Sequence, residues 1–214
     1  MNPLFVSTFI TLFVVIDPVG CAPIFAGLIR GGSTRETLSA ALRATCIATL
    51  ILLAFAFFGP QFLELQHIEL DSFRIAGGLM LFLIALDMVF DKRTQRREER
   101  NEKLTNPDAT PVPQTPKEDI AVFPMAMPMI AGPGSIAAVM LAMAKAHAMQ
   151  TQAAVIGALL AVMVLTLAAL AAAGPLMKLL GTRVEGVITR VLGVLLGALA
   201  VQYVVDGLRG VVGL

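Results

Sequence analysis

A carboxylate and two prolines interrupt the first apolar segment of the chain, which runs from Leu4 to Ile29. A segment of this length can cross a lipid bilayer as a helix. Asp17, near its middle, would cost about 3 kcal/mol at the bilayer centre, and a proline inside a helix removes a hydrogen bond and clashes with the preceding turn. The sequence therefore predicts a broken helix, whose freed peptide groups are shielded by protein or line a wet cavity.

Apolar segments of similar length recur along the whole chain. Only 14% of the residues are charged, whereas soluble domains carry about 25%. We therefore expect an all-α integral membrane protein with six transmembrane helices. The expected segments are about 4–29, 38–58, 73–90, 120–144, 153–177 and 187–205.

Lysine and arginine collect in the connections on one side of the predicted membrane. The opposite side holds only Arg74, Lys145 and Arg209. Because short basic connections stay in the cytoplasm, we expect both termini outside and the long loop 91–119 in the cytoplasm. The prolines in this loop predict a flexible linker, and its bases leave open the alternative of a patch that binds anionic lipid.

The two halves of the chain resemble each other. Pro18 matches Pro133 at an offset of 115 residues, and Gly59-Pro60 matches Gly174-Pro175 at the same offset. Each half has three predicted spans, and an odd number forces the second half to insert upside down. Inverted repeats with broken helices at the midplane are a recurring plan of secondary transporters. The sequence thus predicts one membrane domain, made of a first repeat (about 1–91), a linker (about 92–118) and a second repeat (about 119–214) with its own first helix, the fourth span, broken.

The predicted break in the fourth span lies within the stretch from Pro124 to Ser135, which has no charged residue. The N-terminal ends of half-helices carry partial positive charge and can hold a carboxylate. Freed carbonyls can bind a cation or an ammonium group, so paired breaks suit a small zwitterion. The candidate substrate-binding residues are Asp17, Pro18, Gly20 and Pro23 at the first break, and Gly132, Pro133, Gly134 and Ser135 at the second.

Several of these residues have more than one interpretation. Asp17 is the candidate ammonium partner, proton carrier or sodium ligand, and it can also cap the second half-helix, with Pro18 at the first helical position. Ser135 can bind substrate or bond back to its own helix. Asp87, near the end of the third span, is a second candidate for ion coupling, although anchoring at the membrane interface is the favoured interpretation.

Three stretches resemble the signature segments of the MarC family: IDPVGCAPIF from residue 16, RIAGGLMLFLIALDM from residue 74 and VFPMAMPMIAGPGSI from residue 122. This family is also described as a six-span neutral amino acid transporter family within the LysE-like transporter group. The resemblance covers nearly the whole chain. It implies a bacterial or archaeal inner membrane protein with two inverted three-helix repeats, and a substrate such as glycine or alanine.

The leading hypothesis is a secondary transporter of small neutral amino acids, coupled to protons or sodium. The alternatives are an exporter of another small metabolite or ion, and a non-transport assembly or regulatory protein. An enzyme is not expected, because the sequence has no acid/base pair or nucleophile set within one plausible site, no metal-ligand spacing and no nucleotide loop. We expect no cofactor, no metal and no nucleic acid; the expected partners are the amino acid, the coupling ion and the bilayer, and a homo-oligomer is left open.

Overall fold

The computed structural model describes residues 2–29, 33–90 and 121–213, and within these ranges every regular element is a helix. The predicted linker lies outside the described residues. In chain order the elements are α1 (Pro3–Ile16), α2 (Pro18–Leu28), α3 (Thr34–Leu65), α4 (Leu70–Val89), the π-helix η1 (Ala121–Ile130), α6 (Pro133–Ala144), α7 (Met149–Ala171) and α8 (Ala173–Val212).

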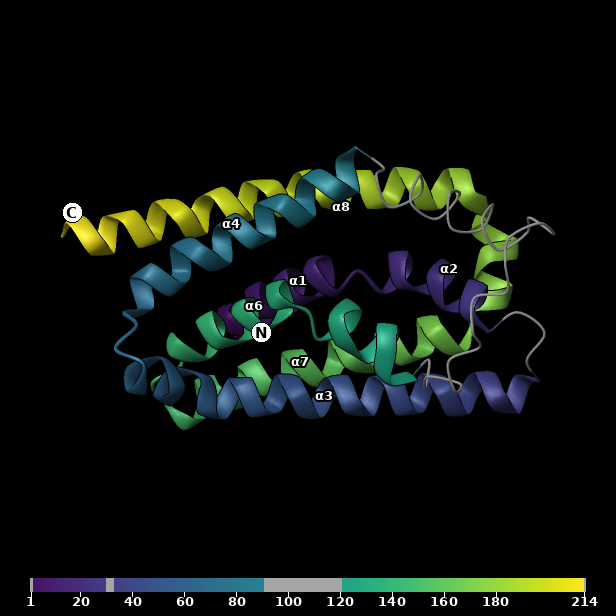
Figure 1. Ribbon diagram of the computed structural model, residues 1–214, viewed down its shortest axis with the longest axis horizontal. Coiled ribbons are helices and arrows are strands. Elements are labelled where there is room, and N and C mark those ends of the chain that lie inside the picture. The colour runs from purple at the N-terminus through teal and green to yellow at the C-terminus, as the bar shows by residue number, and fades with distance from the viewer. Residues whose placement is uncertain (1, 30–32, 91–120, 214) are drawn as a thin grey trace, which may run out of the picture.

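Five helical stretches among the described residues are long and apolar enough to cross a membrane. The first is α1 and α2 taken together, which follow one another along one line with a break between them (Figure 1). The others are α3, α4, α7 and the part of α8 from Gly186 to Val212. The stretch expected to be a fourth span is divided into η1 and α6, and α6 is a shorter apolar helix.

Two helices begin outside the apolar segments from which they were predicted, and a local capping signal sets the start of one of them. Helix α3 begins at Thr34, because Ser33 and Glu36 form a capping box in which the Glu36 N–H donates to Ser33 Oγ at 3.3 Å and the Ser33 N–H donates to Glu36 Oε2 at 2.7 Å. Such reciprocal bonds satisfy the free N–H groups of the first turn. At the other end of the chain, α8 starts at Ala173, well before the predicted segment.

Helices α4 and α8 form a closely packed antiparallel pair. A Cβ atom on Gly78 would lie 2.8 Å from the carbonyl oxygen of Ala200, and one on Gly207 would lie 2.8 Å from the carbonyl oxygen of Asp71. Similarly, a Cβ on Gly193 would lie 2.8 Å from the Cβ of Met88. Glycines therefore let the two backbones approach along almost the whole length of the pair, as small residues do between membrane helices.

The remaining helices form a second layer beneath this pair (Figure 1). Helix α3 packs on η1, α6 and α7, while α7 packs on α1 and α2. The two layers meet where α8 touches α1 and α2 and where α4 touches α6. The α3–α4 turn and the end of α8 lie at one end of the molecule, and the start of α3 and the α7–α8 junction lie at the other (Figure 1).

The close α4–α8 contact predicts the effect of adding a single methyl group. Gly78→Ala places a Cβ against backbone atoms of α8, so the free energy of unfolding is expected to fall by about 1–3 kcal/mol. Gly186→Ala is the matched control on α8, because nothing lies within 4 Å of its Cβ position. Unfolding in detergent micelles measures both variants; equal stability of the two would contradict the tight packing of this pair.

Candidate functional site

Asp17 forms the whole of the break between α1 and α2. Its backbone is left-handed, with φ 49° and ψ 68°, and its side chain is 1% exposed. The Asp17 N–H donates to the Phe13 carbonyl at 3.0 Å and closes α1. Its Oδ1 accepts the N–H of Gly20 at 3.0 Å, and Pro18 occupies the first position of α2. The expected helix cap is present, and it holds a carboxylate in the protein interior.

Only glycine at position 20 leaves room for the Asp17 carboxylate. A Cβ on Gly20 would lie 2.7 Å from Asp17 Cγ and would overlap the carboxylate oxygen beside it. Any larger side chain would force the Asp17 side chain away from the start of α2. The glycine in the DPVG sequence is thus required by the cap itself.

The second break combines a π-helix with a short linker. Pro124 and Pro128 have no N–H and cannot continue an α-helical ladder. The backbone between Ala121 and Ile130 instead forms a ten-residue π-helix, and the Ala131 N–H donates to the Ala126 carbonyl at 2.9 Å. Helices of this type are rare and occur mostly as single turns, frequently at functional sites. The proline spacing was a signal for irregular structure, but the prediction did not identify the π-helix.

Both breaks satisfy a freed carbonyl in the same way. The Cys21 thiol donates to the Ile16 carbonyl at 3.3 Å, and the Ser135 hydroxyl donates to the Ile130 carbonyl at 2.6 Å. In each case the donor lies five residues after the last residue of the first half-helix. Ser135 also reaches the Gly132 carbonyl at 3.0 Å. Of its two interpretations, the structure therefore shows the bond to its own segment.

The two breaks are neighbours in space. A Cβ on Gly134 would lie 3.4 Å from Val15 Cγ1 on α1, and 2.9 Å from Leu81 and 2.8 Å from Ile84 on α4. The start of α6 thus lies beside the end of α1, with α4 against both. Most of the predicted site residues are buried here, whereas Pro23 is half-buried and Pro133 is exposed. The buried residues are Asp17, Pro18, Gly20, Gly132, Gly134 and Ser135.

Asp87 lies near this centre but outside it. Ile84, which borders Gly134, precedes Asp87 by one helical turn on α4. The Asp87 side chain is half-buried, whereas Phe90, one turn further, is 63% exposed. The position is compatible with either of its predicted roles, ion coupling or anchoring at the interface.

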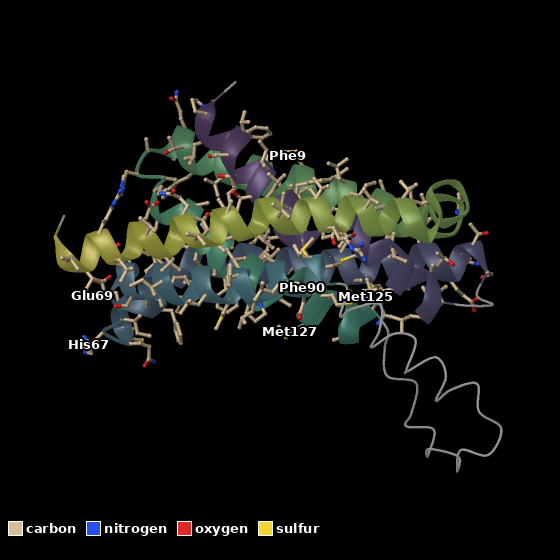
Figure 2. All side chains as sticks on the ribbon, turned by 90° about the horizontal axis from the view of Figure 1, so that it is seen from above. Phe9, His67, Glu69, Phe90, Met125 and Met127 are labelled. Carbon is tan, nitrogen blue, oxygen red and sulfur yellow. The ribbon has the colours of Figure 1, made fainter. Side chains whose placement is uncertain are left out.

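Two cavities lined by described residues lie away from the breaks. One, of about 470 Å³, is at the α3–α4 turn and includes Glu64, His67 and Glu69 in its wall. Figure 2 shows His67 and Glu69 at the end of the molecule where α8 finishes, far from Met125 and Met127 of η1. The other, of about 290 Å³, is an apolar hollow along α3 between Ala54 and Phe62. No residue of either break belongs to these two walls.

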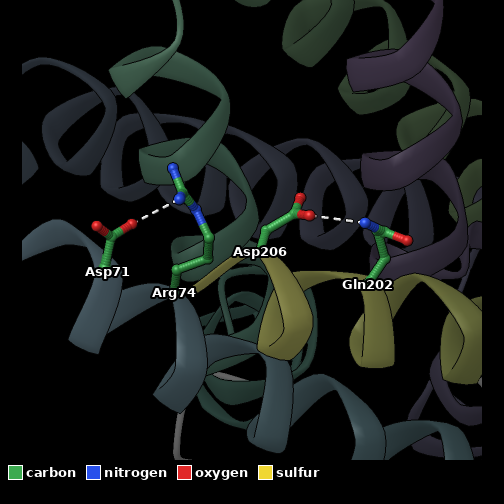
Figure 3. Close-up of polar contacts among 4 residues, drawn as sticks. All are labelled: Asp71, Arg74, Gln202 and Asp206. Carbon is green, nitrogen blue, oxygen red and sulfur yellow. Dashed lines mark hydrogen bonds and ion pairs between the residues drawn. The ribbon is translucent and has the colours of Figure 1, made fainter. Parts of the chain in front are cut away.

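A polar cluster near the same end was not identified from the sequence as a unit. Arg74 Nη1 donates to Asp71 Oδ1 at 2.6 Å on α4, and Gln202 Nε2 donates to Asp206 Oδ1 at 2.6 Å on α8 (Figure 3). Tyr203 lies between Gln202 and Asp206 in the sequence of α8 and is 8% exposed. Each pair lies within one helix, the first on α4 and the second on α8.

The sequence pattern of the MarC family integral membrane proteins matches residues 2–212. This chain belongs to that family. It is accordingly an integral, multi-pass membrane protein, as the resemblance of its signature segments predicted. No solved structure is significantly similar to it.

The relatives of this MarC chain are membrane proteins of bacteria and archaea. It is 36% identical over 206 residues to a UPF0056 membrane protein of Methanocaldococcus jannaschii, covering 96% of each chain. It is 33% identical to the UPF0056 membrane protein YvbG of Bacillus subtilis, over 96% of this chain and 94% of the relative. It is 31% identical to YhcE of Escherichia coli, over 98% and 94%.

The Asp17 cap makes a prediction for two glycines of α2. Gly20→Ala is expected to displace the Asp17 carboxylate and to lower the free energy of unfolding by about 1–3 kcal/mol. The melting temperature would then fall by several degrees, since 1 kcal/mol corresponds to about 2–4 °C in a chain of this size. Gly27→Ala is the control, because nothing lies within 4 Å of its Cβ position. A Gly20→Ala protein as stable as the control would refute the requirement for glycine.

Proposed function

We propose that this protein is a secondary active transporter of small neutral amino acids, coupled to protons or sodium, which works by alternating access around its two breaks. The observation that carries the proposal is the close approach of two interrupted crossings, one of them ending on a buried carboxylate. A charge in this position is expensive in a bilayer and is by default a functional group. Unwound backbone at membrane depth likewise occurs where it is shielded by protein or lines a cavity.

The pattern of helix contacts supports a six-span architecture with two inverted repeats. In this architecture α1–α2, α3 and α4 correspond to η1–α6, α7 and α8. The packing of α3 on η1 and α6 then has its counterpart in that of α7 on α1 and α2. The contact of α4 with α6 is the counterpart of that of α8 with α2, and the α3–α7 and α4–α8 pairs are their own counterparts. A two-fold axis in the membrane plane would generate this exchange.

The two half-helix starts differ in a way that suits a zwitterion. The start of α2 is capped by Asp17, whereas no side-chain hydrogen bond caps the start of α6 at Gly132. The N–H groups of Gly134 and Ser135 on α6 are therefore suited to bind the substrate carboxylate. The Asp17 carboxylate of the neighbouring break would receive the ammonium group. The signature segments of the family imply a substrate such as glycine or alanine, whose side chain is a hydrogen or a methyl group.

Coupling follows from the same carboxylate. The buried Asp17 carboxylate, which caps α2, would lose its negative charge on binding a proton and would have it balanced on binding a sodium ion. Asp87, one turn beyond the centre, is the second candidate for ion coupling. The protein would lie in the bacterial or archaeal inner membrane as one domain, with both termini outside and the 91–119 loop in the cytoplasm. It would need no cofactor, and we propose no enzymatic role for it.

Transport assays on Asp17→Asn test the central residue. Asparagine keeps a side-chain oxygen for the Gly20 N–H but removes the charge. Counterflow of labelled alanine and glycine in proteoliposomes is expected to fall by about tenfold or more, since losing about 1.4 kcal/mol changes a rate by a factor of ten. The dependence on a pH or sodium gradient should vanish with it. Glu64→Gln, an exposed acid on α3, is the control; no flux of any small amino acid through folded wild-type protein would end the proposal.

The size of the substrate can be tested by thermal stability. A ligand present at 100 times its dissociation constant stabilises the folded state by about 2.7 kcal/mol, which raises the melting temperature by about 5–10 °C here. Glycine and alanine should show this shift, and leucine and phenylalanine should not. A shift that grew with side-chain size would contradict the proposed small site.

A further inference from the structure

The molecule divides into two packed bodies that do not coincide with the two halves of the sequence. The α4–α8 pair is one body, closed by glycine contacts at Gly78, Gly193 and Gly207. The other body holds both broken crossings together with α3 and α7. Helices α4 and α8 pack on each other more extensively than either packs on a helix of the other body. A rocking motion that leaves each body intact would therefore move α4 and α8 together.

Tyr203 joins the two bodies at the end of the molecule where α8 finishes. It is the single tyrosine of the chain, which also has no tryptophan. Its side chain is buried on α8, and its hydroxyl lies close to the side chain of Thr11 on α1. Lys145, at the end of α6, places its Nζ 5.8 Å from the centre of the Tyr203 ring, within range of a cation–π contact.

The charged groups beside Tyr203 belong to its own body. The Arg74–Asp71 pair lies on α4, and the Asp206–Gln202 pair lies on α8 (Figure 3). The Asp71 carboxylate also lies against the backbone of α8 at Gly210, where a Cβ would overlap it. These contacts stiffen the end of the α4–α8 pair. Tyr203, by contrast, reaches across to α1 and to the end of α6, so a separation of the bodies at this end would break its contacts.

We infer that Tyr203 is the latch of a gate, which closes the route from this end of the molecule to Asp17 by holding the α4–α8 pair against α1 and α6. Thr11 precedes Asp17 on α1 by six residues, or about 9 Å along the helix. The latch therefore lies between the end of the molecule and the break. This inference rests on the proposed function, since it makes the break a site that opens by alternating access.

The native Cys21 reports on this gate without any transport assay. Its thiol is buried beside the Asp17 break and is 2% exposed. In a Cys46→Ala background, the rate at which a membrane-impermeant methanethiosulfonate labels Cys21 measures how often the route is open. Gln66→Cys, an exposed position at the α3–α4 turn, identifies the membrane face at which this end of the molecule lies.

Opening the latch is expected to expose Cys21 from that face alone. Tyr203→Ala should raise the labelling rate by about tenfold, because the open population grows with the stabilisation that is removed from the closed state. Tyr203→Phe and Thr11→Val should each raise it less, and the double variant should equal either single variant, since both act on the same contact. Leu208→Ala, exposed at the same end of α8, should change nothing.

The outcomes separate the latch from the transport proposal. An unchanged labelling rate in Tyr203→Ala, with amino acid counterflow intact in the wild type, overturns the latch and leaves the transporter. Faster labelling from both faces, with a lowered melting temperature, also overturns it, because that result reports general loosening. Faster labelling from the predicted face, with no flux of any amino acid, supports the latch as the barrier to Asp17 and removes the proposed cargo.

Discussion

The structure depends on one constraint: peptide groups freed inside an apolar protein must find partners. A carbonyl or N–H group without a partner at membrane depth costs several kcal/mol. Each break meets this constraint with its own side chains, Asp17 and Cys21 at one and Ser135 at the other. The breaks are therefore stable features with defined geometry. Because their partners are local, the second break needs no charge, and Asp17 is the one carboxylate among the described residues of the two breaks.

The constraint also explains why small residues gather around the centre. Gly20 leaves room for the Asp17 carboxylate, and Gly134 lets α6 begin against Val15 of α1 and Leu81 of α4. Each glycine brings one backbone close to another group, so the N–H groups at the starts of the half-helices lie within protein. The α4–α8 pair uses glycine differently, to join two continuous helices along their length. The α4–α8 interface holds two helices together as one body. The glycines at the breaks instead leave room for polar groups.

The sequence predicted the features that rest on local chemistry. The break at Asp17, its cap on α2 and the irregular backbone before Pro133 all follow from residue types that a continuous helix does not tolerate. Features that depend on long-range packing were not accessible in the same way. Nothing near Tyr203 in the sequence indicates that Thr11 and Lys145 approach it, and the ten-residue π-helix reflects how prolines 124 and 128 are accommodated by their surroundings. Helix ends differed because capping groups such as Ser33 extend a helix past its apolar segment.

Asp17 carries a carboxylate and also caps α2. As the cap of α2, its carboxylate interacts favourably with the partial positive charge of the helix start. In the proposed transporter, a bound proton would weaken this interaction and a substrate ammonium group would draw the carboxylate toward itself. Either event would change how firmly α2 is held at the break. Helix α1 packs on α6, α7 and α8, and helix α2 packs on α7 and α8. A change at this single carboxylate therefore acts on helices of both bodies, which is the physical connection that coupled transport requires between an ion and a conformational change.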